Sequence, residues 1–148
     1  MEKWFSNQVV VITGAGRGIG FSTAKLFAQY GANLVINDYD ANCADNAANE
    51  LKNLGCQVLS VPGDVTDPKY PDSLMEKAVE TYGKINVIVN NAGYTWDGMV
   101  HKMTDKQFTA MLEIHNVAPF RMIRAAAPYM REIAKQEKAE GKPHEPRS

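Results

Sequence analysis

Residues 13–20 read T-G-A-G-R-G-I-G and follow directly on the apolar run Val9 to Ile12. Glycines between a buried strand and a helix predict a tight turn that leaves the first backbone N–H groups of the helix uncovered. Such a helix N-terminus suits a phosphate group. Because position 19 is isoleucine, the spacing is T-G-x-x-x-G-x-G and not G-x-G-x-x-G. A glycine-rich turn also occurs as a plain connection, so the rest of the chain decides whether this turn binds a phosphate or only connects a strand to a helix.

Apolar stretches alternate with helical patterns along the whole chain. Strands are predicted near residues 8–13, 32–37, 57–61 and 85–90, and helices near 18–30, 41–54, 70–82 and 104–136. This alternation predicts an α/β fold with a parallel sheet. The chain has 148 residues, 45% of them hydrophobic, which suffices for one core. The last helix has an N-cap at Thr104, and Pro119 and Pro128 should each kink it or break its hydrogen bonds locally.

Polar residues stand where the second, third and fourth predicted strands end. Asp38 lies 18 residues beyond Gly20, about where the ribose-binding acid of a dinucleotide fold belongs. Gly63-Asp64-Val65 follows the third strand, and Asn91-Ala92-Gly93 follows the fourth. Since the carboxyl ends of parallel strands meet at one edge of a sheet, these residues are expected around the glycine turn.

Together, these motifs resemble the short-chain dehydrogenase/reductase family, which carries T-G-x-x-x-G-x-G, an aspartate after the third strand and N-N-A-G after the fourth. The resemblance covers Val9 to about Arg131, and the segment after Gly93 is similar to the 3-oxoacyl-[acyl-carrier-protein] reductases. It implies a Rossmann-type doubly wound sheet, of which this chain holds about four strands in the order 3-2-1-4. It also implies an NAD(P)-dependent oxidoreductase that transfers a hydride between nicotinamide and a carbonyl or secondary alcohol.

The resemblance also assigns roles to individual residues. Asn116 stands where the family carries the catalytic asparagine of its proton relay; without the resemblance it is an ordinary polar residue on a helix face. Asp64 and Val65 match the family's adenine contacts, although an aspartate here also suits a turn into the next helix. The expected cofactor-binding residues are Gly14, Gly16, Arg17, Gly18, Ile19, Gly20, Asp38, Asp64, Val65, Asn91, Ala92 and Gly93.

Asp38 favours NAD as the cofactor. Its carboxylate can accept hydrogen bonds from the two ribose hydroxyls, whereas a 2′-phosphate would meet like charge. Arg17, in the phosphate turn, could instead reach a 2′-phosphate, which keeps NADP open.

The chain contains no Y-x-x-x-K, the pair that classical members use together with a serine. We therefore expect residues 1–148 to be one incomplete dinucleotide-binding domain that ends in a charged helix end and a solvated tail over 131–148. In the order 3-2-1-4 the fourth strand would be an uncovered edge. The alternative is a non-catalytic dinucleotide-binding module or an inactive truncated partner.

Charge and composition bear on partners and location. A formal net charge of −1 gives no reason to expect nucleic acid or an anionic membrane as a partner. The early apolar run is too short for an export signal, so a cytoplasmic protein with reduced Cys43 and Cys56 is expected. The histidines and cysteines lack paired ligand spacing, so no metal site is expected. The resemblance implies a small-molecule carbonyl or alcohol substrate and a homo-oligomer formed through the helix near 104–136.

Overall fold

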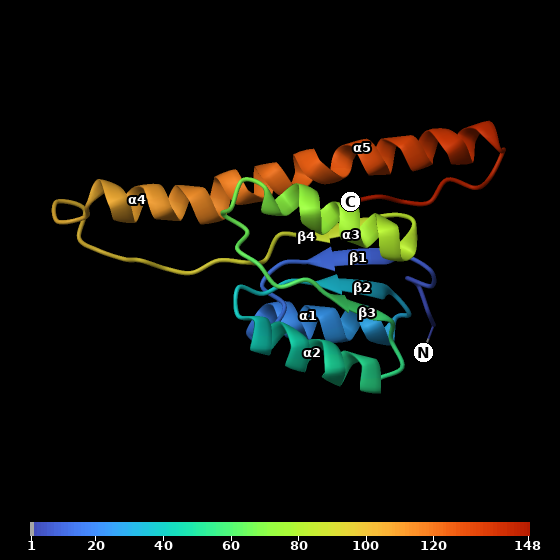
Figure 1. Cartoon of the computed structure of the whole chain (residues 1–148), viewed down its shortest axis with the longest axis horizontal. Helices are drawn as coiled ribbons and strands as arrows, with labels where there is room; N and C mark the ends of the chain where they lie inside the picture. The colour runs from blue at the N-terminus through green and yellow to red at the C-terminus, as the bar shows by residue number, and fades with distance from the viewer. Residues whose placement is uncertain (1) are drawn as a thin grey trace.

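The computed structural model describes residues 2–148, which form one parallel four-stranded sheet between two layers of helices (Figure 1). The strand order is β3-β2-β1-β4, so the predicted order is confirmed. Val10 of β1 stands opposite Leu34 of β2 and Val87 of β4. The strands are β1 (Val9–Ile12), β2 (Asn33–Ile36), β3 (Val58–Ser60) and β4 (Val87–Val89).

Alternating residues of β1 supply the two halves of the core. Val9 and Val11 pack in the cluster of α3 and α5, and Val10 and Ile12 pack in the cluster of α1 and α2. All four are fully buried, as expected for a central parallel strand with helices on both faces. Figure 1 shows the two helix pairs on opposite faces of the sheet. These helices are α1 (Gly18–Gln29), α2 (Ala41–Asn53), α3 (Tyr70–Tyr82) and α5 (Ala118–Ala139).

The helix expected over 104–136 consists of three parts. A capping box between Thr104 and Gln107 starts α4 (Asp105–Leu112), which passes into the π-helical turn η1 (Glu113–Val117) and then into α5. The local distortion expected beside Pro119 is therefore present, and Pro119 lies in the first turn of α5, where its missing N–H is tolerated. At Pro128, whose missing N–H removes one hydrogen bond of the helix, α5 nevertheless continues to Ala139.

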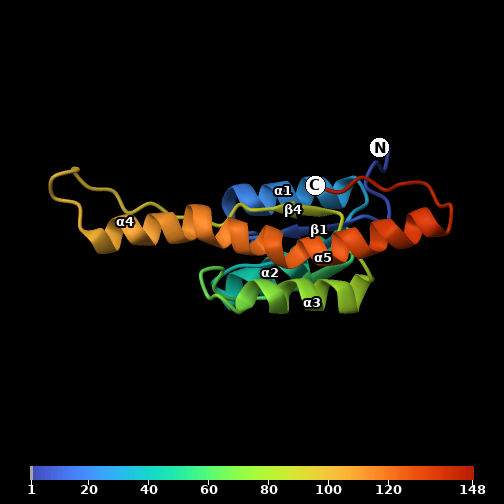
Figure 2. The same cartoon turned by 90° about the horizontal axis from the view of Figure 1, so that it is seen from above.

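Figure 2 shows α4 and α5 along nearly one line, with α4 extending beyond the sheet. Among residues 2–148, no helix combines the length and the apolar character that crossing a bilayer requires.

The tail after α5 returns to the sheet, although most of residues 140–148 are exposed. Ser148 donates its N–H to the Asn86 carbonyl and accepts from the Ile88 N–H, at 2.8 and 2.7 Å. Glu145 accepts from Lys84 Nζ and from the Asn86 side chain. The edge of β4 is therefore covered at these positions, where a free edge was expected.

A second ion pair joins the tail to α5. The side chains of Arg147 and Glu137 are 8% and 14% exposed, and Arg147 Nη2 lies 2.6 Å from Glu137 Oε1. The hydrogen bond from Arg147 holds the pKa of Glu137 below its ordinary value, and that from Lys84 does the same for the pKa of Glu145.

These lowered pKa values predict that the tail detaches in acid. A carboxylate whose pKa is lower in the folded state contributes stability above its ordinary pKa, about 4.5 here, and loses it as the pH falls through the lowered value. We expect protection of the Ile88 amide from hydrogen exchange to fall between pH 5 and about pH 3, relative to the Leu34 amide within the sheet. Glu145→Gln should lower protection at pH 7 and shrink this acid step. A constant ratio of the two protection factors across this range would contradict the prediction.

Candidate dinucleotide-binding site

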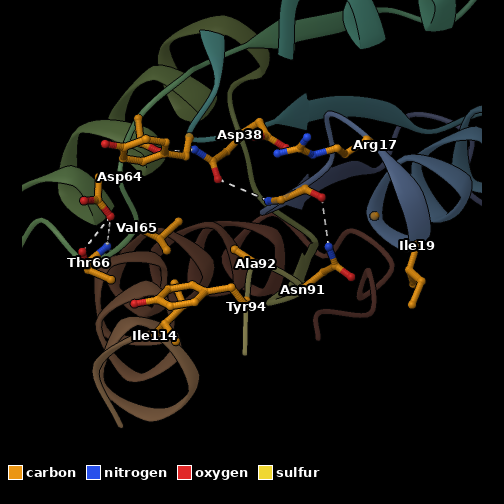
Figure 3. A pocket seen from close by; sticks show the side chains of 16 residues that line it. Arg17, Ile19, Asp38, Asp64, Val65, Thr66, Asn91, Ala92, Tyr94 and Ile114 are labelled. Carbon is orange, nitrogen blue, oxygen red and sulfur yellow. Dashed lines mark hydrogen bonds between the residues drawn. The ribbon is translucent and has the colours of Figure 1, made fainter. Parts of the chain in front are cut away.

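A cavity of about 650 Å³ lies at the carboxyl ends of the strands (Figure 3). In this view Asp38 and Arg17 lie along one side of it, and Tyr94 and Ile114 along the other. Its walls come from the glycine turn, from the residues after β2, β3 and β4, and from η1. The lining residues are Gly14, Arg17, Ile19, Gly20, Asn37, Asp38, Tyr39, Gly63, Asp64, Val65, Thr66, Asn91, Ala92, Gly93, Tyr94 and Ile114.

The glycine turn is shaped by close packing. A Cβ on Gly20 would lie 2.2 Å from the Gly14 carbonyl oxygen, and one on Gly14 would lie 2.8 Å from Ala92 Cα. Gly18 has a left-handed φ of +59° and no neighbour within 4 Å of a Cβ position. Arg17, the N-cap of α1, makes no side-chain capping bond in the described chain. The first N–H groups of α1 thus have no side-chain cap. They lie beside the cavity, where free N–H groups suit an anion.

Two asparagines hold the turn in place. Asn91 Nδ2 donates to the carbonyls of Thr13 and Gly14, each at 3.0 Å, and Figure 3 draws the second of these bonds. Asn37 Oδ1 accepts from the Gly14 N–H at 3.3 Å, and its Nδ2 donates to the Gly63 carbonyl at 2.9 Å. Asn37 therefore ties the ends of three strands together. Sequence reasoning missed it, although a polar residue at the end of an apolar strand was a usable signal.

Asp38 is 7% exposed and held by backbone donors. Its Oδ2 accepts from the Gly16 N–H at 3.0 Å, and its Oδ1 accepts from the Asp40 N–H at 3.1 Å. A Cβ on Gly16 would lie 2.7 Å from Asp38 Oδ2, so glycine at position 16 makes room for the carboxylate. Tyr39, beside it in the cavity wall, is 80% exposed.

The loop after β3 supplies a second acidic group. Asp64 Oδ1 accepts from the Thr66 N–H at 2.8 Å and from the Thr66 hydroxyl at 2.7 Å (Figure 3). Arg121 of α5 donates to the Thr66 carbonyl and pairs with Glu113 of η1, so the loop is joined to both. Tyr70 contacts Asn37 through its hydroxyl, and burial raises the pKa of that hydroxyl. Asp64 shapes its own turn and does not cap α3, which begins at Tyr70.

The structure gathers most of the predicted site residues in one cavity. Three of them do not line it: Gly16, Gly18 and Asn116. Asn116 and the neighbouring His115 are both exposed residues of η1, and His115 also contacts the Tyr94 carbonyl. Among residues 2–148, no three His, Cys, Asp or Glu side chains group closely enough to hold a metal ion. The lining residues that sequence reasoning missed are Asn37, Tyr39, Thr66, Tyr94 and Ile114.

Comparison with known proteins agrees with this geometry. The chain is 35% identical to the 3-oxoacyl-[acyl-carrier-protein] reductase FabG of Thermotoga maritima over 123 residues, which cover 83% of this chain and 50% of the reductase. The structure of L-sorbose reductase from Gluconobacter frateurii with NADPH and L-sorbose matches with a TM-score of 0.86 and 31% identity, over 90% of this chain and 51% of that one.

A short-chain dehydrogenase/reductase from Burkholderia phymatum in complex with NAD matches with a TM-score of 0.83 and 28% identity, over 93% of this chain and 47% of that one. The chain thus spans about half the length of these three relatives. The family model for short chain dehydrogenases matches residues 8–141, nearly the whole chain. On this match and the shared fold, the chain belongs to the short-chain dehydrogenase family.

Proposed function

We propose that this chain is the cofactor-binding part of an NAD(P)-dependent oxidoreductase that acts on a carbonyl or secondary alcohol. The observation that carries the proposal is the cavity in which the uncapped start of α1, the buried carboxylate of Asp38 and the Asn91-Ala92-Gly93 segment meet. These residues fit a dinucleotide, because the glycine turn leaves its backbone open and the strand ends supply polar groups. When bound, the nicotinamide would supply or accept the hydride.

In this proposal each part of the cavity wall contacts a different part of the cofactor. The first turn of α1, with Gly14, Gly16, Gly18, Ile19 and Gly20 around it, holds the pyrophosphate. Asp38 orients the adenosine ribose, Asp64 and Val65 contact the adenine, and Asn91, Ala92 and Gly93 lie beside the nicotinamide ribose. In this proposal Asn116 on η1 takes part in the proton relay, as the sequence predicts. The tyrosine, lysine and serine of the family's proton transfer are not in this chain, so the proposal requires them elsewhere in the protein.

NAD is the proposed cofactor, because a 2′-phosphate beside the Asp38 carboxylate would meet like charge. Arg17, in the glycine turn on the same side of the cavity, is the feature that favours NADP. For the substrate we propose a 3-oxoacyl thioester, on the strength of the match to the 3-oxoacyl-[acyl-carrier-protein] reductase; the match to L-sorbose reductase favours a sugar.

A homo-oligomer formed through α4 and α5 belongs to the same proposal. Phe108, Leu112, Phe120 and Ile123 are 42–58% exposed along these helices. Large apolar side chains gathered on one pair of helices support a protein interface there.

Gly18→Ala tests the cofactor site with a matched control. A methyl group at the start of α1 should obstruct the phosphate, so we expect NADH affinity to fall by about tenfold or more. Gly55→Ala is the control, because Gly55 also has a left-handed φ, +83°, and open space around it but follows α2 and does not stand at the start of α1. Both variants carry similar backbone strain. Calorimetric titration with NADH measures the effect. A wild-type protein that binds no NADH would contradict the proposed function, and equal loss in both variants would assign the effect to strain.

A further inference from the structure

Glu113 and Arg121 form an ion pair that spans the π-helical turn η1. Glu113 is the first residue of η1, and Arg121 lies in the first turn of α5. Arg121 Nη1 donates to Glu113 Oε1, and the side chains of Arg121 and Glu113 are 21% and 33% exposed. The same nitrogen donates to the Thr66 carbonyl at 3.3 Å. One guanidinium group therefore contacts both η1 and the loop after β3.

This ion pair depends on the π turn. Residues eight apart on an uninterrupted α-helix point about 80° apart, because each residue turns the helix by about 100°. A π turn holds one extra residue, so across η1 eight residues correspond to about seven of an α-helix and return to the same face within about 20°. Glu113 and Arg121 are eight residues apart, and the Ala118 N–H donates to the Glu113 carbonyl across the turn. The extra residue of η1 thus brings the two charges onto one face, and their attraction stabilises the turn.

The contact with Thr66 joins η1 to a second wall of the cavity. Thr66 donates its N–H and its hydroxyl to Asp64 Oδ1, and its carbonyl accepts from Arg121. Asp64 and Thr66 line the cavity from the loop, and Ile114 lines it from η1. The helix that carries Arg121 is fixed in the core by the neighbouring Met122, which is 1% exposed. Arg121 therefore holds two walls of the cavity in place relative to the core.

We propose that Arg121, paired with Glu113, is a positioning residue of the dinucleotide site. It fixes the turn η1 to the loop 64–66 and so sets the distance between the two ends of the site. This inference rests on the proposed function, in which the loop contacts the adenine and η1 carries the relay group of the nicotinamide end. Arg121 itself does not line the cavity, so it acts through Thr66 and Glu113.

Hydrogen exchange in the full-length protein, followed by NMR, tests whether Arg121 holds the turn and the loop. The Ala118 amide reports on the π turn, and the Thr66 amide reports on the loop. Arg121→Met keeps the apolar stem of the side chain and removes its charge and donors. We expect it to speed exchange of both amides by about five- to tenfold and to leave the Leu34 amide within the sheet unchanged. Arg121→Lys should restore most of the protection, since an ammonium group can still donate to both oxygens.

Calorimetric titrations with NADH and AMP measure the consequence for binding. AMP represents only the adenosine end, whereas NADH reaches both ends of the site. We expect Arg121→Met to weaken AMP binding by about threefold and NADH binding by about tenfold or more, because both walls are released. Glu113→Gln frees η1 alone, so it should weaken NADH binding and leave AMP affinity within about twofold. Arg131→Met is the matched control, because Arg131 is an exposed residue of the same helix ten positions further on.

Unchanged exchange of the Ala118 and Thr66 amides in Arg121→Met would overturn the inference. An equal effect in Arg131→Met would also overturn it. Faster exchange of the Leu34 amide by the same factor would do so as well, because that result would show general destabilisation. Should Arg121→Met not fold, Glu113→Gln decides, and an unchanged rate at Ala118 in that variant would overturn the inference.

The titrations separate this inference from the proposed function. If the wild type binds neither NADH nor AMP, the proposed function fails and the role of Arg121 toward the dinucleotide fails with it. If the wild type binds both and Arg121→Met binds both equally well, only the inference fails.

Discussion

Replacing Asp38 with alanine and Tyr39 with arginine should shift the cofactor preference of this protein toward NADPH by about 30- to 1,000-fold. Two like charges about 4 Å apart repel by about 4 kcal/mol at an effective dielectric constant of about 20. Removing the Asp38 carboxylate therefore relieves a large part of its repulsion toward the 2′-phosphate of NADPH. The shift corresponds to about 2–4 kcal/mol. Arginine at position 39 would add a cation at a side chain that is already 80% exposed in the cavity wall.

The measurement is a pair of calorimetric titrations, with NADH and with NADPH, on each variant. Asp38→Asn is the companion variant, because its amide oxygen can still accept from the Gly16 N–H while the charge is gone. Asp72→Asn removes the same charge from the exposed first turn of α3 and should change neither affinity. Unchanged selectivity in the double variant would contradict the role given to Asp38.

Gly20→Ala should lower the free energy of unfolding by about 1–4 kcal/mol. The new Cβ would lie 2.2 Å from the Gly14 carbonyl oxygen and 2.4 Å from Asn91 Nδ2, so the glycine turn or the Asn91 side chain must move. Overpacking of this kind costs about 1–3 kcal/mol, and the loss of the hydrogen bond from Asn91 to Gly14 adds about 1 kcal/mol. Glycine to alanine within an ordinary helix acts in the opposite direction, by up to about 1 kcal/mol.

Urea unfolding followed by circular dichroism gives the free energy, provided that the slope against urea concentration stays the same. Ser22→Ala is the control, since Ser22 is exposed two residues further along α1 and its replacement should be neutral or slightly stabilising. An unfolding midpoint for Gly20→Ala at or above that of the wild type would show that the turn relaxes freely, contrary to this account.

Much of the site follows from the order of residues along the chain. The run Val9–Ile12 is apolar at every position because β1 is covered on both faces, and that pattern is visible without coordinates. The rule that parallel strands end at one edge then brings Asp38, Asp64 and Asn91 to one cavity, as the structure confirms. What the sequence did not indicate is the contact of Ser148 and Glu145 with the edge of β4. Charged residues near prolines predict an exposed loop, and the local pattern does not reveal a partner that is distant in the sequence, such as Lys84.

The sequence by itself determined the order of the strands and helices, the glycine turn and the family to which the chain belongs. The succession of elements along the chain and the glycine turn rest on periodicity and turn chemistry, which act over a few neighbouring residues, whereas the strand order and the family follow from the resemblance of the motifs. Only the tertiary structure decided that Asn37 joins three strand ends, that Gly16 makes room for Asp38, and that His115 contacts Tyr94. The physical reason is that each of these contacts joins residues 21 to 26 positions apart in the sequence, and the packing of the elements decides which of such residues meet.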